Sequence, residues 1–209
     1  METLILTEAG LDCACAVIKG GGLTAVPTET VYGLSADGLN PDAVERIYAV
    51  KGRPETKPIN LLVSGMDSVR HFCRDIPDDA YTLAKKFWPG PLTMILYKKS
   101  VVPDIVTAGG ATVGVRCPDH RLTLKLLELC GVPLATPSAN ISGMPSPKCA
   151  KDVLKYFDGK IPCVIDGGEC RVGVESTIVD MTVFPYKILR QGGLSRADIE
   201  AALGTEAIL

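Results

Sequence analysis

The sequence predicts a mixed fold of strands and helices, of the α/β or α+β class. Short runs typical of β-strands alternate with helical stretches along the 209 residues. Hydrophobic residues make up 46% of the chain and aromatic residues 5%. The core must therefore be built from Val, Ile, Leu and Ala, which suits a sheet covered by helices. This length fits one compact domain over residues 1–209, with no repeat or linker dividing it.

The first half of the chain is predicted to alternate between the two element types. In chain order we expect strand Thr3–Leu6, helix Leu11–Lys19, strand Leu23–Val26, helix Asp42–Val50, strand Ile59–Val63, helices Ser68–Arg74 and Asp79–Phe87, and strand Leu92–Tyr97. Asn40-Pro41 is expected to open the second helix, because Asn caps helices and Pro suits their first turn.

The second half continues the pattern. We expect strand Thr112–Arg116, helix Arg121–Cys130, strand Leu134–Thr136, helix Ala150–Tyr156, strands Cys163–Ile165, Thr177–Met181 and Lys187–Arg190, and helix Arg196–Leu203. Ser195 is the expected N-cap of the last helix and Gly204 its stop signal.

Charge and hydropathy exclude several classes of protein. The net charge of −2 argues against a uniformly basic nucleic-acid-binding surface, so any anion site must be a local cluster. No apolar run approaches ~20 residues, and the N-terminus lacks a basic segment followed by an apolar one. We therefore expect neither a membrane span nor a secretory signal, and a cytoplasmic location.

The eight cysteines contain no Cys-x-x-Cys pair, and most have apolar neighbours. Reduced, mostly buried thiols in a reducing compartment are expected. Cys117 and His120 have a Cys-x-x-His spacing, but a single such pair is a weak zinc signal because structural zinc needs about four ligands. No metal site is predicted.

Polar and basic residues repeatedly stand at the ends of the expected elements. Pro27–Thr30 and Pro137–Asn140 follow strands, Lys51–Pro54 follows a helix, and Arg116 and Arg190 each end a strand. A sheet can aim such side chains at a common ligand.

The segment Lys51–Lys57 carries three positive charges on a loop that Gly52 and Pro54 keep from being helical. Arg53 has the forked geometry that suits phosphate oxygens, and the two lysines would act as point charges. A solvated basic loop explains the same residues about as well.

Two further polar segments are ambiguous. The segment 109–116 is glycine-bearing and offers the Thr112 hydroxyl, but it matches neither a P-loop nor a dinucleotide fingerprint, and a turn before a strand explains it equally. The segment 136–146 is rich in hydroxyls and amides, which suit a polar ligand or an ordinary turn. Ser176 either reaches a ligand or caps its strand. The two histidines and the scattered acids support neither a catalytic triad nor paired-carboxylate hydrolysis.

Six blocks in order resemble one family. They are PTETVYGL (27–34), YAVKGRP (48–54), VGVRCP (113–118), PSANISG (137–143), ESTIVD (175–180) and ILRQG (188–192). Together they are similar to the YrdC-like threonylcarbamoyl-AMP synthases, over about residues 4–203. The resemblance implies a twisted, largely open mixed sheet flanked by helices, with a concave, positively charged cavity.

The activity that this resemblance implies is synthesis of L-threonylcarbamoyladenylate and pyrophosphate from L-threonine, bicarbonate or CO2, and ATP. The product would serve threonylcarbamoyladenosine modification of tRNA by a downstream transferase complex. Mg²⁺ is expected to arrive with ATP. By the same resemblance Lys51 and Arg53 are catalytic. The nucleotide would be bound by Arg53, Lys57, Thr112, Ser138, Asn140, Ser146 and Arg190. L-threonine would be bound by Thr30, Arg116, Thr136 and Ser176.

The sequence departs from the family pattern at one position, and two other functions stay open. Many relatives carry a histidine where Leu62 stands here, so one polar contact to threonine is missing or supplied elsewhere. The chain also resembles the short form without an extra C-terminal domain. One alternative is a non-catalytic module that binds double-stranded RNA or tRNA, since the scarcity of aromatic residues counts only against binding of single strands. The other alternative is a small paralogue of unclear activity.

Overall fold

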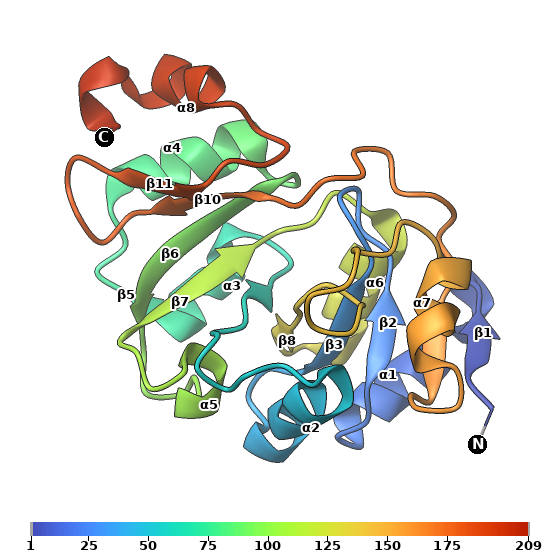
Figure 1. Cartoon of the computed structure of the whole chain (residues 1–209). Helices are drawn as coiled ribbons and strands as arrows, with labels where there is room; N and C mark the ends of the chain where they lie inside the picture. The colour runs from blue at the N-terminus through green and yellow to red at the C-terminus, as the bar shows by residue number, and fades with distance from the viewer. Residues whose placement is uncertain (1, 209) are drawn as a thin grey trace.

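The computed structural model describes residues 2–208 and contains a mixed sheet with helices packed around it (Figure 1). The strands are β1 (Leu4–Leu6), β2 (Thr24–Val26), β3 (Gly33–Asp37), β4 (Leu61–Leu62), β5 (Cys73–Arg74), β6 (Leu92–Lys98), β7 (Thr112–Arg116), β8 (Leu134–Ala135), β9 (Cys163–Ile165), β10 (Thr177–Asp180) and β11 (Lys187–Arg190). The α-helices are α1 (Leu11–Lys19), α2 (Pro41–Lys51), α3 (Met66–Phe72), α4 (Asp78–Phe87), α5 (Asp104–Thr107), α6 (Arg121–Cys130), α7 (Ala150–Phe157) and α8 (Arg196–Leu203).

The sheet runs in the order β1-β9-β2-β3-β8-β4-β7-β6-β10-β11, with β5 paired to β6. The sheet is mixed: it contains parallel pairs such as β4–β7 and β6–β10, and antiparallel pairs such as β2–β3 and β6–β7. Neighbours in the sheet are often far apart in the chain, so the sheet brings distant segments together. The expected mixed, open sheet is confirmed, and its two edges, β1 and β11, lie at opposite ends of the molecule (Figure 1).

Helices bury the aliphatic faces of the sheet. α1 and α6 form one apolar cluster with β2 and β9, in which Ile18 and Leu126 are fully buried. α2 and α4 contribute to a larger cluster around the central strands, which includes Ile47 and Leu83. α4 and α8 pack together beside β10 and β11 (Figure 1). The aliphatic core predicted from the composition is thus present on both sides of the sheet.

The predicted helix caps are confirmed. The Asn40 side chain accepts hydrogen bonds from the backbone of Asp42 (3.1 Å) and Ala43 (3.3 Å) at the start of α2. Ser195 and Asp198 form a reciprocal capping box at the start of α8, and Gly204 is the C-cap that follows its last residue. These contacts satisfy backbone groups that a helix terminus leaves free.

Two strands and one α-helix were not predicted: β3, β5 and α5. The β3 sequence Gly-Leu-Ser-Ala-Asp has few residues with strand propensity, and its position between β2 and β8 fixes it instead. The helix expected over Ser68–Arg74 runs from Met66 to Phe72, and its last two predicted residues form β5. The strand expected over Ile59–Val63 pairs as a strand only at Leu61–Leu62.

All eight cysteines are free thiols, and five of them are buried. None of the described helices is both long and apolar enough to cross a membrane.

Candidate active site

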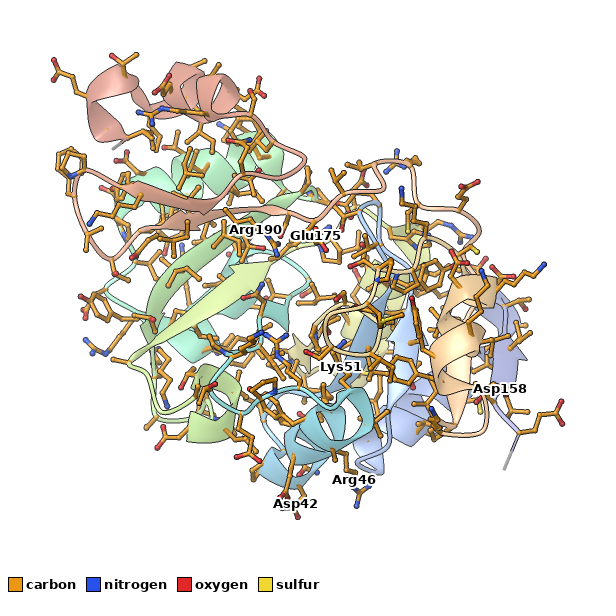
Figure 2. All side chains as sticks on the ribbon, viewed as in Figure 1. Asp42, Arg46, Lys51, Asp158, Glu175 and Arg190 are labelled. Carbon is orange, nitrogen blue, oxygen red and sulfur yellow. The ribbon has the colours of Figure 1, made fainter. Side chains whose placement is uncertain are left out.

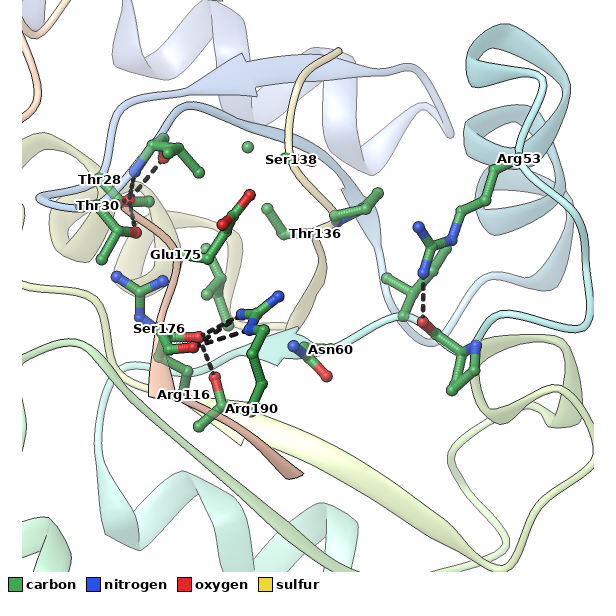
Figure 3. A pocket seen from close by; sticks show the side chains of 17 residues that line it. Thr28, Thr30, Arg53, Asn60, Arg116, Thr136, Ser138, Glu175, Ser176 and Arg190 are labelled. Atoms are coloured by element: carbon green, nitrogen blue, oxygen red, sulfur yellow. Dashed lines mark hydrogen bonds between the residues drawn. The ribbon is translucent and has the colours of Figure 1, made fainter. Parts of the chain in front are cut away.

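A cavity opens in the middle of the sheet, where segments from both halves of the chain meet (Figure 3). Its empty volume is about 710 Å³, part of which is open to solvent. The walls come from the turn after β2, the approach to β4, the ends of β7 and β8, and the β10–β11 pair. Their polar residues are Thr28, Thr30, Arg53, Asn60, Thr93, Arg116, Thr136, Ser138, Glu175, Ser176 and Arg190.

Arg116 is a buried cation at the end of β7, with 7% of its surface exposed. Its Nε donates to the carbonyl of Gly90 (3.2 Å), and its Nη2 lies 2.7 Å from Oε2 of Glu29, which is 3% exposed. That oxygen also accepts the backbone N–H of Asp119 (3.1 Å). Neither Nη2 of Arg116 nor Oε1 of Glu29 has a hydrogen bond of good geometry among the described residues. The guanidinium is therefore held in place with donor capacity to spare.

Arg190, the last residue of β11, reaches the cavity beside Arg116 (Figures 2 and 3). Its Nε and Nη2 donate to the carbonyl of Ser176 at 3.0 and 2.9 Å, and Nη2 also donates to the Ser176 hydroxyl at 3.1 Å. That hydroxyl is 2.8 Å from the hydroxyl of Thr93. Burial of the guanidinium lowers the pKa of Arg190 from its ordinary value, although this side chain still carries its charge at neutral pH.

Oriented hydroxyls line the wall between these arginines and the turn after β2. Thr28 donates to the carbonyl of Val31 (2.7 Å), so its contact with Thr30 (2.9 Å) must use the Thr30 proton. Thr136 donates to the carbonyl of Leu134 (3.0 Å), so its contact with Ser35 (2.8 Å) must use the Ser35 proton. The hydroxyl oxygens of Thr30 and Thr136 thus each keep a lone pair that can accept a hydrogen bond from a ligand.

Arg53 stands across the cavity from Arg116 and Arg190 (Figure 3). It lies just beyond the C-terminus of α2, and its Nε and Nη2 donate to the carbonyls of Lys57 (3.2 Å) and Pro58 (2.9 Å). Burial lowers the pKa of Arg53 from its ordinary value. Of the three cations in the segment Lys51–Lys57, Arg53 thus lines the cavity, whereas Lys57 is exposed.

Lys51 is the last residue of α2 and does not line the cavity (Figure 2). Its Nζ donates to the carbonyls of Ser138 (2.5 Å) and Asn140, and its own carbonyl accepts the N–H of Ser142 (2.9 Å). The side chain is 1% exposed, and burial lowers the pKa of Lys51 to about 7. Lys51 therefore fastens the loop after β8 to α2, and so positions Ser138 at the cavity.

The structure brings together seven of the predicted site residues: Thr30, Arg53, Arg116, Thr136, Ser138, Ser176 and Arg190. The others do not line the cavity. Lys51 and Asn140 support its wall, and Ser146 donates to Glu175 (2.8 Å), which does line it. Thr112 begins β7, four residues before Arg116, and pairs with Tyr97 away from the cavity. Leu62, where many relatives are expected to carry histidine, is buried and gives the wall an apolar patch.

Two carboxylates at the site were missed from the sequence, although both lie in the blocks that carry the resemblance. Glu29 pairs with Arg116, and Glu175 faces the cavity. The acids looked scattered because their partners are distant in the chain: Glu29 and Arg116 are separated by 87 positions. Asn60 and Thr93 also line the cavity and had no local signal. Within residues 2–208 no three His, Cys, Asp or Glu side chains form a metal-binding group.

Comparison with known proteins places this geometry in a family. The family model Sua5_yciO_yrdC, described as "Telomere recombination", matches residues 16–192. The threonylcarbamoyl-AMP synthase of Pyrococcus abyssi is 50% identical over 199 residues, which cover 95% of this chain and 58% of the relative. The threonylcarbamoyl-AMP synthase of Bacillus subtilis is 43% identical over 204 residues, covering 97% of this chain and 59% of the relative.

A solved structure agrees with these matches. The crystal structure of P. abyssi Sua5 complexed with L-threonine superposes with a TM-score of 0.96 at 47% identity, over 99% of this chain and 63% of that one. The chain thus spans about 60% of the length of these relatives. The matched segment contains every residue of the cavity wall. The chain therefore belongs to the Sua5/YciO/YrdC family.

Proposed function

We propose that the chain is an L-threonylcarbamoyladenylate synthase. It would convert L-threonine, bicarbonate or CO2, and ATP to threonylcarbamoyl-AMP and pyrophosphate, which is a nucleotidyl transfer. The observation that supports this most is the convergence of Arg53, Arg116 and Arg190 with several hydroxyls on one cavity. The names of the similar proteins support the same reaction. The product would pass in the cytoplasm to a transferase that modifies tRNA.

The proposed chemistry needs positioning and positive charge more than it needs a protein nucleophile. The threonine amine and bicarbonate give a carbamate and water, with release of the ammonium proton. A carbamate oxygen then attacks the α-phosphorus of ATP, and pyrophosphate leaves with the bonding electrons. Negative charge develops on the phosphate oxygens during this step, and fixed guanidinium groups stabilise it without reorganising.

We divide the residues of the cavity between the two substrates. On the nucleotide side we assign Arg53, Ser138 and Arg190, with Lys57, Thr112, Asn140 and Ser146 as further candidates. On the amino-acid side we assign Arg116, Thr30, Thr136 and Ser176. The spare donors of Arg116 suit a carboxylate, and the lone pairs of the threonine hydroxyls suit an N–H or O–H of the substrate. Mg²⁺ would enter as part of the ATP substrate, because the wall offers one carboxylate among the described residues and not a cage of ligands.

A pyrophosphate-release assay tests the proposal. Purified chain is incubated with MgATP, bicarbonate and L-threonine, and each component is omitted in turn. We expect pyrophosphate only in the complete mixture, with an adenylate product that contains the threonyl carbamate. Pyrophosphate release that ignores threonine or bicarbonate, or no release at all, would contradict the proposed reaction.

A further inference from the structure

Glu175 is an acidic side chain in a wall that otherwise carries positive charge. The cavity wall contains three arginines, and within residues 2–208 Glu175 is the only carboxylate that faces the same space. Glu29 is close to the site but is sealed beneath it, where it pairs with Arg116. A cationic group that enters the cavity therefore meets a single opposite charge, that of Glu175.

The Glu175 carboxylate is oriented and has one oxygen free. Its Oε1 accepts a hydrogen bond from the Ser146 hydroxyl (2.8 Å). Its Oε2 makes no hydrogen bond or ion pair with any residue from 2 to 208, although Arg116 and Arg190 line the same cavity. Figure 3 shows the carboxylate beside Thr136, pointing away from the guanidinium groups of Arg116 and Arg190. An oriented acceptor with spare capacity is suited to a ligand donor.

The backbone around Glu175 is also fixed. Its carbonyl accepts the N–H of Gly193 (3.0 Å). A Cβ at Gly192 would lie 2.2 Å from the same carbonyl oxygen, so only glycine allows the chain to pass this closely. The close packing of residues 192 and 193 against Glu175 leaves its side chain little freedom to move away from the cavity.

An amino acid is a zwitterion at neutral pH and presents opposite charges on groups that share one carbon. Arg116 offers the donors that its carboxylate needs. The ammonium group needs an acceptor of opposite charge, because three guanidinium groups in the same cavity would repel it. We propose that Oε2 of Glu175 binds the α-ammonium of the amino-acid substrate, and that Ser146 positions this carboxylate instead of contacting nucleotide. This inference rests on the proposed function and names the ammonium subsite within it.

Binding measurements with two ligands test the assignment. Glu175→Gln keeps the shape of the side chain and removes its charge. L-Threonine and (R)-3-hydroxybutyrate, which lacks only the ammonium group, are titrated calorimetrically without ATP or Mg²⁺. We expect the variant to bind threonine about tenfold or more weakly, since a hydrogen bond between two ions is lost. Its affinity for 3-hydroxybutyrate should be unchanged or higher. Ser146→Ala should weaken threonine binding in the same direction by a smaller factor.

Glu169→Gln is the matched control, because Glu169 is exposed on the segment that leads to Glu175 and does not line the cavity. It should bind both ligands as the wild type does. If the wild type binds no threonine, the proposed function fails. If the wild type binds threonine and Glu175→Gln binds it equally well, the ammonium subsite is wrong. A separate titration with MgATP gives the remaining outcome: a Glu175→Gln variant that binds threonine as the wild type does but has lost MgATP affinity would assign Glu175 to magnesium and would also overturn the inference.

Discussion

At the scale of single residues, contacts within the protein hold the charged side chains of the site in position before a ligand binds. Arg116 is held by Glu29 and Gly90, and Arg190 by Ser176. Both guanidinium groups are thus positioned at little further cost in side-chain entropy when an anion arrives. Lys51 and Arg53 are only two residues apart, yet Arg53 lines the cavity whereas Lys51 holds the loop that carries Ser138. Each of them leads to a different prediction.

Arg53→Ala is expected to abolish pyrophosphate release while leaving the fold intact. The guanidinium lines the cavity, and its contacts within the protein are to two backbone carbonyls of its own loop. Loss of one fixed charge that stabilises a transition state costs about 100-fold or more in rate. The rate is measured by pyrophosphate release and folding by thermal melting. Arg46→Ala, on α2 just before this loop and outside the cavity, should keep nearly full activity. Near-normal turnover of Arg53→Ala would refute its role.

The second residue-scale prediction concerns pH. Burial lowers the pKa of Lys51 from 10.5 to about 7, so between these values the unfolded chain binds more protons at this position than the native chain does. The contribution of Lys51 to stability should therefore rise with pH across this window. A neutral amine still has two N–H donors for the carbonyls of Ser138 and Asn140.

Urea unfolding of the wild type and of Lys51→Met at about pH 6 and about pH 9 measures this effect. We expect the stability advantage of the wild type over the variant to be larger at the higher pH. Lys57→Met, at an exposed position of the same loop, should change the unfolding free energy little at either pH. An advantage that is the same at both values would mean that Lys51 remains charged throughout the window.

At the scale of elements, β3 shows how neighbours can override local preference. Gly33, Ser35 and Ala36 are poor strand formers, yet β3 is buried between β2 and β8. Small side chains are needed here because the strands are crowded. A Cβ at Gly33 would lie 2.3 Å from Cγ2 of Thr136, a residue of the cavity wall. The small side chains of β3 give it low strand propensity, so the sequence does not predict this strand, and the same small side chains let it pack closely against the cavity wall.

Gly33→Ala is expected to displace Thr136 and to weaken binding of L-threonine, with a loss of stability of about 1–3 kcal/mol from overpacking. Thr136→Ser removes the methyl group that collides and keeps the hydroxyl. The double variant should therefore recover most of both losses, as titration calorimetry and urea unfolding would show. Gly65→Ala is the control, since its added Cβ meets no atom within 4 Å. If the double variant were no better than Gly33→Ala, the collision would not be the cause.

At the scale of the whole molecule, the sequence predicts the elements better than their arrangement. Local patterns suffice for helices such as α1, α6 and α8, whose bounds agree with the expected ones. The order of strands depends on pairings between distant segments, such as β10 with β6, for which no local pattern exists. The same limit applies to the site. Polar residues at the ends of elements predicted a shared ligand site, and the six sequence blocks that carry the family resemblance contain most residues of the cavity wall. The fold is needed to recognise three further residues of the site, because it places Glu29 against Arg116 and brings Asn60 and Glu175 into the cavity wall.

This arrangement leads to a last prediction, because a ligand in the cavity would contact segments from the middle of the sheet and from its β11 edge. Ser138 follows β8, whereas Ser176 directly precedes β10 and Arg190 ends β11. A bound threonine and a non-hydrolysable ATP analogue should therefore connect the two regions. A ligand that binds only the native arrangement slows its local opening. Hydrogen exchange of backbone amides should slow together in residues 136–146 and 173–193, at ligand concentrations well above Kd. The β1 edge, which lies outside the cavity wall, should exchange at an unchanged rate. Protection confined to one of the two segments would mean that the ligands bind on one side and that the cavity does not act as a unit.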